Sequence, residues 1–362
     1  MKYVDEFRDA DIVSKLEKKI NINNVGKKIN LMEVCGGHTH AIYKYGLQEI
    51  LPDEINLLSG PGCPVCVTPQ EYIDKAIVLA QKEDIIITSF GDMLKVPGSR
   101  SSLKKEKSRG HSIKICYSPD EAIRTAVENR KKEIVFLGIG FETTAPSIAQ
   151  TIKKAREEKI NNFSVLPASK TMPEAMEALL QSEEVAIDGF ICPGHVSTIT
   201  GSTIYNFIPE EYNIPCVISG FEPVDILESI NKLIKQINKE ESKVENQYTR
   251  SVKIKGNKKA KAIMYTVFTK SESKWRGLGT IPESGLQISE EFKKYNAENR
   301  FDISVPKPDK SDECICGAIM RGVQSPQDCS LFKTSCTPKS PVGPCMVSSE
   351  GPCAAFYKYQ LS

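Results

Sequence analysis

Residues 29–40, with the sequence INLMEVCGGHTH, hold the clearest structural signal in the chain. The first half is a short apolar run of the kind that forms a buried β-strand. It leads directly into Gly36 and Gly37, where the backbone can turn sharply. A strand that ends in such a turn is typical of parallel α/β sheets, in which ligands bind beyond the carboxyl ends of the strands.

The same pattern recurs over the first 230 residues. Five further β-rich runs are each followed by a Gly/Pro-rich turn or a polar segment: 56–59, 85–88, 133–138, 189–191 and 216–219. Helical patterns lie between several of them, as at 70–81 and 118–129. The alternation predicts an α/β protein with parallel-type sheets.

A weak internal repeat suggests how these elements are grouped. Residues 57–65 resemble 190–196, and residues 87–92 resemble 218–223. We therefore predict two related α/β domains whose loops face a common cleft, followed by a cysteine-rich C-terminal domain, with these bounds: 1–117, 118–230 and 231–362. Chance similarity among Gly/Pro turns is the alternative explanation of the repeat.

The turn after the first strand contains Cys35, His38 and His40 within six residues. A thiol and two imidazoles this close together could bind a transition metal. Alternatively, His38 could lower the pKa of Cys35 and make it a nucleophile. A buried cysteine beside histidines that hydrogen-bond the backbone is the structural alternative.

A second loop, GPGCPVC at residues 60–66, contains Cys63 and Cys66. A Cys-x-x-Cys pair can form a disulfide or give two bonds to one metal, and a helix that starts near it would stabilise a thiolate. One such pair cannot close a tetrahedral zinc site, so a structural zinc would need ligands from elsewhere.

Two further loops supply polar groups to the predicted cleft. Residues 138–146, GIGFETTAP, contain Glu142 but lack the third glycine of the dinucleotide-binding fingerprint, because Thr143 takes its place. They predict a cleft-lining carboxylate or a plain strand-to-helix turn. His195 follows the run at 189–191, and the repeat places it opposite the Cys63 loop, with a structural histidine as the alternative.

Six of the twelve cysteines lie between Cys314 and Cys353. The last four are spaced by seven, nine and eight residues, and four thiolates suffice for a [4Fe–4S] cluster: Cys329, Cys336, Cys345 and Cys353. Cys314 and Cys316 are held in reserve as ligands. Zinc is the rival metal, although zinc ribbons normally use C-x₂-C pairs.

Composition limits the class of protein. Lys and Arg total 48 against 46 Asp and Glu, a net charge of +2 that calls for no nucleic-acid or membrane partner. The first residues are charged, and no run approaches the roughly 18 apolar residues of a membrane span. We expect a soluble, cytoplasmic protein, in which clustered cysteines indicate metal or redox chemistry. Residues 95–109 form a basic loop, read as a solvated loop or, alternatively, as a partner-docking site or lid.

Together these motifs resemble those of the hydrogenase maturation HypD family. The resemblance extends from about residue 30 to residue 359. It is carried by four loop motifs and by the six-cysteine tail with its MVSSEG sequence: 35–40, 60–66 with Pro69, 140–146, 193–201 and 346–351. The combination is specific, although its single pieces are not.

The resemblance implies a role in making the Fe(CN)₂CO unit of [NiFe]-hydrogenases. It implies that Cys35, Cys63 and Cys66 are the functional thiols, and that the tail holds a [4Fe–4S] cluster. Its implied partners are a small chaperone, HypC, and a carrier of cyanide-derived groups, HypE. Around the cluster the family is also similar to ferredoxin:thioredoxin reductase, which places a disulfide beside an iron–sulfur cluster. A redox-active assembly scaffold is therefore expected, rather than a conventional turnover enzyme.

Two other functions stay open at this point. A thiol–disulfide oxidoreductase acting on proteins would use the same Cys-x-x-Cys pair without assembling Fe(CN)₂CO. A nucleotide-dependent enzyme using residues 138–144 is disfavoured, because no Walker lysine follows the glycines.

Overall fold

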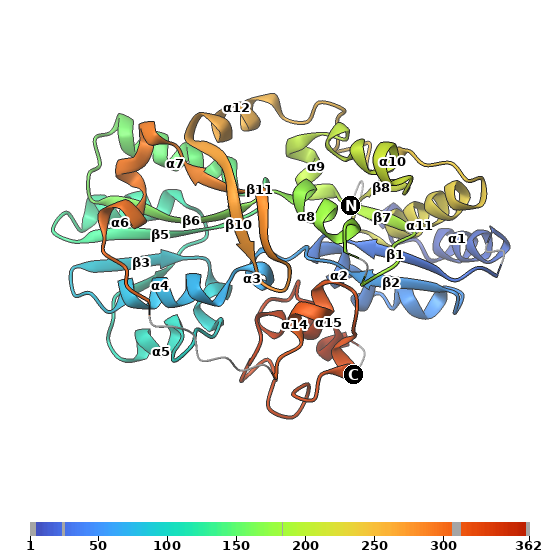
Figure 1. Ribbon diagram of the computed structural model, residues 1–362, viewed down its shortest axis with the longest axis horizontal. Helices are drawn as coiled ribbons and strands as arrows, with labels where there is room; N and C mark the ends of the chain where they lie inside the picture. Colours follow the sequence, from blue (N-terminus) through green and yellow to red (C-terminus); the bar gives the residue numbers. More distant parts are fainter. Residues whose placement is uncertain (1–4, 24–25, 183, 306–312, 360–362) are drawn as a thin grey trace.

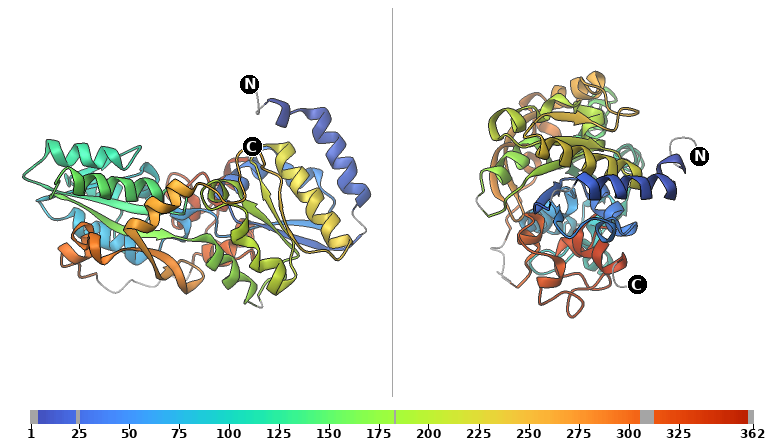
Figure 2. Two further views of the ribbon diagram at one scale, coloured as in Figure 1. Left: turned by 90° about the horizontal axis from the view of Figure 1, so that it is seen from above. Right: turned by 90° about the vertical axis from the view of Figure 1, so that its right-hand side faces the viewer.

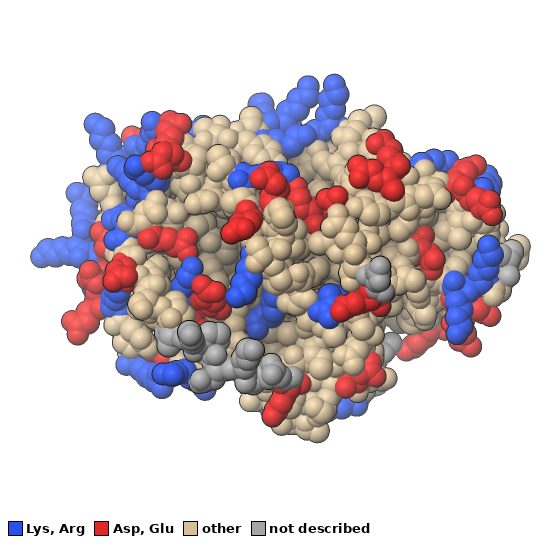
Figure 3. Space-filling view, viewed as in Figure 1, with Lys and Arg blue, Asp and Glu red and all other residues tan. Residues whose placement is uncertain are grey.

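Two β-sheets with helices on their faces make up most of the molecule, and the cysteine-rich tail packs beneath them (Figure 1). The computed structural model describes residues 5–23, 26–182, 184–305 and 313–359. Within this part of the chain, no helix is both long and apolar enough to cross a membrane. Acidic and basic side chains are intermixed over the face shown in Figure 3.

The first sheet contains only parallel strands. In spatial order they are β2 (Ile55–Ser59), β1 (Ile29–Glu33), β7 (Gly189–Pro193), β8 (Cys216–Ser219) and β9 (Val244–Asn246). Helices α1 (Ala10–Asn23) and α11 (Pro223–Asn238) pack against each other beside this sheet, as Figure 2 shows. The C-terminal part of α11 is largely buried, because Ile230 and Leu233 pack in the core beside this sheet.

The second sheet has a parallel centre and an antiparallel edge. Its order is β10 (Phe268–Trp275), β11 (Gly279–Ile288), β6 (Phe163–Lys170), β5 (Glu133–Gly140), β3 (Ile85–Ser89) and β4 (Ile113–Ile115). Strand β5 is buried almost throughout, as its continuous apolar sequence requires of a central parallel strand covered on both faces. The helices around this sheet are α4 (Gln70–Ala80), α5 (Leu103–Ser108), α6 (Asp120–Glu128), α7 (Ala145–Glu157), α8 (Met172–Leu180) and α12 (Lys258–Val267).

The predicted strands are confirmed, but their grouping differs from the predicted division at residues 117 and 118. Strand β1 pairs with β7, and β3 pairs with β5, so this boundary separates strands that share a sheet. The chain passes between the sheets three times, after β2, β6 and β9. Helix α12 and the hairpin β10–β11, expected in the C-terminal domain, belong with the second sheet.

The internal repeat did not give the observed grouping of strands into sheets, because its similarity lies in the turns that follow parallel strands. Its matched segments include β2 and β7, which lie in one sheet, whereas β3 and β8 lie in different sheets. A turn is determined by the residues within it, whereas strand pairing depends on residues far apart in the sequence. Similar turns therefore do not reveal which strands are neighbours.

The described part of the tail is built from short helices. They are α14 (Cys316–Met320), η6 (Pro326–Asp328), η7 (Pro344–Met346) and α15 (Pro352–Tyr359). The tail folds back onto the start of the chain, where α15 packs on α2 (Gly36–Lys44) and η7 on α3 (Pro64–Val67). One apolar core therefore continues from the two sheets into the tail.

Candidate thiol site

Cys35 lies at the junction of β1 and α2, where it is the N-cap residue of the helix. Its backbone N–H donates to Oε2 of Glu33 at 2.9 Å, and its side chain is only 8% exposed. The backbone N–H groups of Gly37 and His38 favour a thiolate here, as expected at a helix N-terminus. Burial is the stronger effect, and with Glu350 and Glu33 nearby it raises the pKa of the Cys35 thiol.

The loop at residues 60–62 lies directly on Cys35. The Gly36 N–H donates to the carbonyl of Gly62 at 3.0 Å. A Cβ atom added to Gly62 would lie 2.3 Å from the backbone nitrogen of Cys35, so only glycine fits. This close approach brings the start of the Cys-x-x-Cys loop against the backbone of Cys35.

Cys63 and Cys66 form a buried pair at the start of α3. Cys63 is the N-cap residue, its sulfur accepts from the Cys66 N–H at 3.3 Å, and the two sulfur atoms lie 2.6 Å apart. The residues are 3% and 1% exposed. Burial raises the pKa of the Cys66 thiol well above its ordinary value.

The tail contacts this pair directly. The Cys66 sulfur lies 3.9 Å from the carbonyl oxygen of Pro344, and the Cys345 side chain interacts with those of Cys66, Cys316 and Cys353. His40 fixes the tail from the other side, because its two ring nitrogens contact the Ser349 carbonyl and the Tyr359 hydroxyl at 3.1 and 3.3 Å. His40 therefore has a docking role.

The six tail cysteines line one small cavity: Cys314, Cys316, Cys329, Cys336, Cys345 and Cys353. Among its described lining residues no carboxylate or imidazole occurs, and the rest of the wall includes Ile319, Phe332 and Met346. An all-thiol donor set in apolar surroundings fits an iron–sulfur cluster better than a hard cation. The space between the side chains is only about 10 Å³, so the thiols would have to move outward to admit a cluster.

Phe221 connects the two predicted histidines. The His38 and His195 rings stack on it, with centroids 4.7 and 3.9 Å away. The Nε2 atom of His38 lies 3.0 Å from the Gly220 carbonyl, whereas its Nδ1 is buried without a partner among the described residues. Burial lowers the pKa of His38 to about 4 and also lowers that of His195. A neutral His38 cannot act as the cation that lowers the pKa of Cys35.

Glu142 accepts a hydrogen bond from the backbone at the start of α8. Its Oε1 accepts from the Met172 N–H at 3.0 Å, and its Oε2 is buried without a partner among the described residues. Burial raises its pKa to about 7. The neighbouring glycines are explained by packing, because a Cβ at Gly138 would lie 2.6 Å from Val165 and one at Gly140 would collide with Thr144.

Sequence reasoning assigned no individual role to three residues that shape the surroundings of Cys35. Glu33 is fully buried and accepts from Cys35 and from the Thr39 hydroxyl, and burial raises its pKa to about 8. Glu350 packs on Gly36, where a Cβ would lie 2.5 Å from the glutamate Cβ. Phe221 is the third. Of the three, only Glu33 stands out in the sequence, because it is a charged residue inside an apolar strand.

In the described part of the chain, no three His, Cys, Asp or Glu side chains are arranged around a single metal position. The fold and site thus define a cysteine-rich α/β protein in which a buried Cys-x-x-Cys pair lies between a helix-capping thiol and a thiol-lined cavity.

Comparison with known proteins gives the family. The HypD profile, described as the hydrogenase formation hypA family, matches residues 11–360. Hydrogenase maturation factor HypD2 of Bradyrhizobium diazoefficiens is 48% identical, with 99% of this chain and 97% of that protein aligned. The hydrogenase expression/formation protein HupD of Azotobacter chroococcum and hydrogenase maturation factor HypD of Cupriavidus necator are 47% and 44% identical at the same coverage. The chain belongs to the HypD family of hydrogenase maturation factors.

Proposed function

We propose that this protein is the scaffold on which the Fe(CN)₂CO unit of [NiFe]-hydrogenase is assembled, with iron as its substrate. The observation that carries the proposal is the contact of Gly62 with Cys35, followed in the sequence by the adjacent sulfurs of Cys63 and Cys66. Three thiols thereby come from two neighbouring loops. Thiolates are the soft ligands that iron carrying CN⁻ and CO requires.

Burial suits these thiols to an oxygen- and water-sensitive cargo. Cys35, Cys63 and Cys66 are each at most 8% exposed, so bound iron would be shielded from solvent. The raised pKa values of Cys35 and Cys66 keep both thiols protonated until iron binds, and binding then releases their protons.

The tail is assigned the redox part of this function. Cys329, Cys336, Cys345 and Cys353 would hold a [4Fe–4S] cluster, which supplies single electrons when bound. In support, the Cys66 side chain interacts with that of Cys345, which lines this cavity. The Cys63–Cys66 pair would open from a disulfide to two thiols on taking up two electrons and two protons, and the thiols would release their protons on binding iron.

A HypC-type chaperone and a HypE-type carrier of cyanide-derived groups are the proposed partners. The support for them is membership of the HypD family, together with a thiol at Cys35 that a partner could share through one iron. Cys35 is the most exposed of the three site thiols, which favours it as the shared ligand.

A thiol–disulfide oxidoreductase acting on other proteins is the second candidate. The adjacent sulfurs of Cys63 and Cys66 favour it. Their burial argues against it, because a protein disulfide must reach an attacking thiolate directly and neither residue is more than 3% exposed.

Infrared spectroscopy tests the proposal. Protein purified without oxygen, from cells that make the partners, is expected to show bands from both CN⁻ and CO bound to iron. Mössbauer spectroscopy of the same sample should resolve this iron from that of the tail. An oxidoreductase would reduce protein disulfides and show no such bands, which would reject the assembly function.

A further inference from the structure

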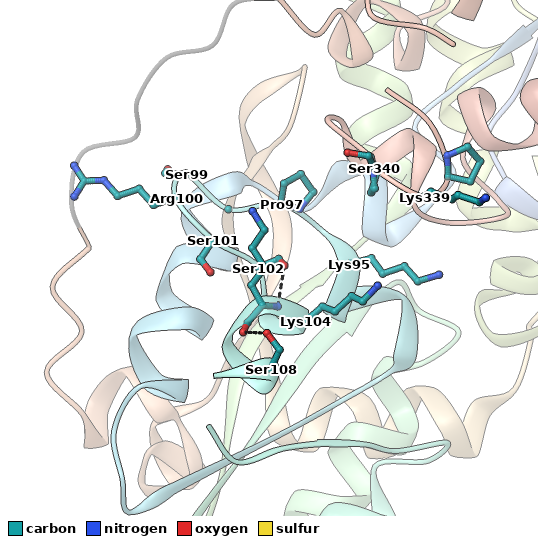
Figure 4. Close-up of a pocket in the computed structure, with 14 residues that line it drawn as sticks. Lys95, Pro97, Ser99, Arg100, Ser101, Ser102, Lys104, Ser108, Lys339 and Ser340 are labelled. Atoms are coloured by element: carbon teal, nitrogen blue, oxygen red, sulfur yellow. Dashed lines mark hydrogen bonds between the residues drawn. The ribbon is translucent and has the colours of Figure 1, made fainter. Parts of the chain in front are cut away.

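A large basic cavity lies between the loop around α5 and the tail. Its volume is about 710 Å³, and five of its lining side chains are cationic: Lys95, Arg100, Lys104, Lys105 and Lys339. The described residues of its wall include several serines and no carboxylate. Figure 4 shows Lys95 and Lys104 on the α5 side of the cavity, with Lys339 and Ser340 on the tail side.

The charge of this cavity is a local feature. The whole chain carries a net charge of only +2. The five cationic side chains around this cavity therefore form a local positive patch and do not reflect a positive charge of the protein as a whole. Lys95, Lys104 and Lys339 are exposed, and no ion pair is formed by any of them among the described residues. Unpaired cations on one surface attract an anionic partner and steer its approach.

The basic cavity continues toward the tail thiols. A second hollow of about 470 Å³ shares Pro97, Gly98 and Ser99 with it and reaches Cys314 and Cys316. Arg276 also lines this second hollow, so its charge has the same sign. Cys314 is the only tail cysteine that is not buried. The thiol-lined cavity is therefore nearest to solvent at the end of a basic surface.

The geometry points to a docking surface for a small acidic protein that carries one electron at a time. This inference rests on the proposed function, in which the Cys63–Cys66 disulfide must be reduced in each cycle. Two reduced carriers and two protons convert one disulfide into two thiols, and each carrier loses one electron. A protein is favoured over a small anion because the basic surface spans two hollows and ends at the half-buried Cys314.

The test uses the full chain, purified without oxygen, and a plant-type [2Fe–2S] ferredoxin as the acidic probe. Binding is measured by isothermal titration calorimetry at low and at physiological ionic strength. The triple variant K95E/K104E/K339E is expected to raise Kd about tenfold or more, and added salt should weaken wild-type binding. The control variant K18E/K19E/K259E makes the same charge change at exposed positions on α1 and α12 and should bind like wild type.

Each possible result supports or overturns the proposed docking surface. Equal Kd values for the two triple variants, or no ferredoxin binding by a wild-type sample that contains four irons and four sulfides, would overturn the docking surface alone. A sample without acid-labile sulfide would overturn the redox part of the proposed function and the docking surface with it. Saturable binding of inorganic phosphate at constant ionic strength, without ferredoxin binding, would identify a small-anion site instead.

Discussion

Replacing Cys35 with alanine is expected to abolish the CN⁻ and CO infrared bands and hydrogenase maturation. Cys35 is one of the three thiols assigned to iron, and no other described cysteine occupies the junction of β1 and α2. The substitution removes a sulfur that is 8% exposed and leaves a small cavity, so the protein should fold with a modest loss of stability. Infrared spectra and hydrogenase activity in cells are the measurements.

The variant Cys116→Ala is the matched control. Cys116 is equally small and buried but follows β4, outside the thiol site. It should keep full bands, and Cys35→Ala should keep the iron and sulfide of its tail. Full bands and normal maturation in Cys35→Ala would make Cys35 a structural residue only.

The tail is expected to contain about four irons and four acid-labile sulfides per chain, and the anaerobic protein should be brown. Cys345→Ser should lose essentially all of both, because Cys345 is buried among the other thiols and next to Cys66. Cys314→Ser should keep them, since Cys314 lies at the edge of the cavity and is a reserve ligand.

Metal analysis with a sulfide assay measures this prediction. One zinc per chain without sulfide would contradict it and favour the zinc alternative. Loss of iron in Cys314→Ser with retention in Cys345→Ser would keep the cluster but reassign its ligands.

Local sequence patterns predicted the strands well. The run at 216–219 matches β8, and the run at 133–138 differs from β5 only at its carboxyl end. Both runs are short, apolar and bounded by turns, which is a signal that the local sequence carries by itself. The hairpin β10–β11 was missed because most residues of its two strands are exposed and many are polar or charged, so the sequence shows no clear alternation of apolar and polar residues.

Strand pairing and the packing of the site could not be predicted in this way. β1 pairs with β7, which lies more than a hundred residues later in the sequence, and no local sequence pattern predicts that pairing. The loops of Cys35 and Cys63 were singled out from the sequence, but their contact depends on Gly62 lying against Cys35. Phe221 received no role from the sequence, yet His38 and His195 both stack on its ring.

Cys63 and Cys66 are proposed to form a redox pair beside the tail cavity, which Cys345 lines. Their sulfurs are 2.6 Å apart, and reversible disulfides in a reducing compartment are usually catalytic or redox-sensing. The pair's potential must lie within reach of its electron source, where about 30 mV corresponds to about 1.4 kcal/mol for a two-electron couple.

A redox titration with thiol trapping in denaturant, followed by mass spectrometry, measures this directly. Cys63 and Cys66 are expected to interconvert between a mutual disulfide and two trappable thiols, while Cys35 stays trappable at every potential. If Cys63 and Cys66 never form a disulfide with each other at any potential, the redox role is wrong and only a plain iron-ligand role remains for them.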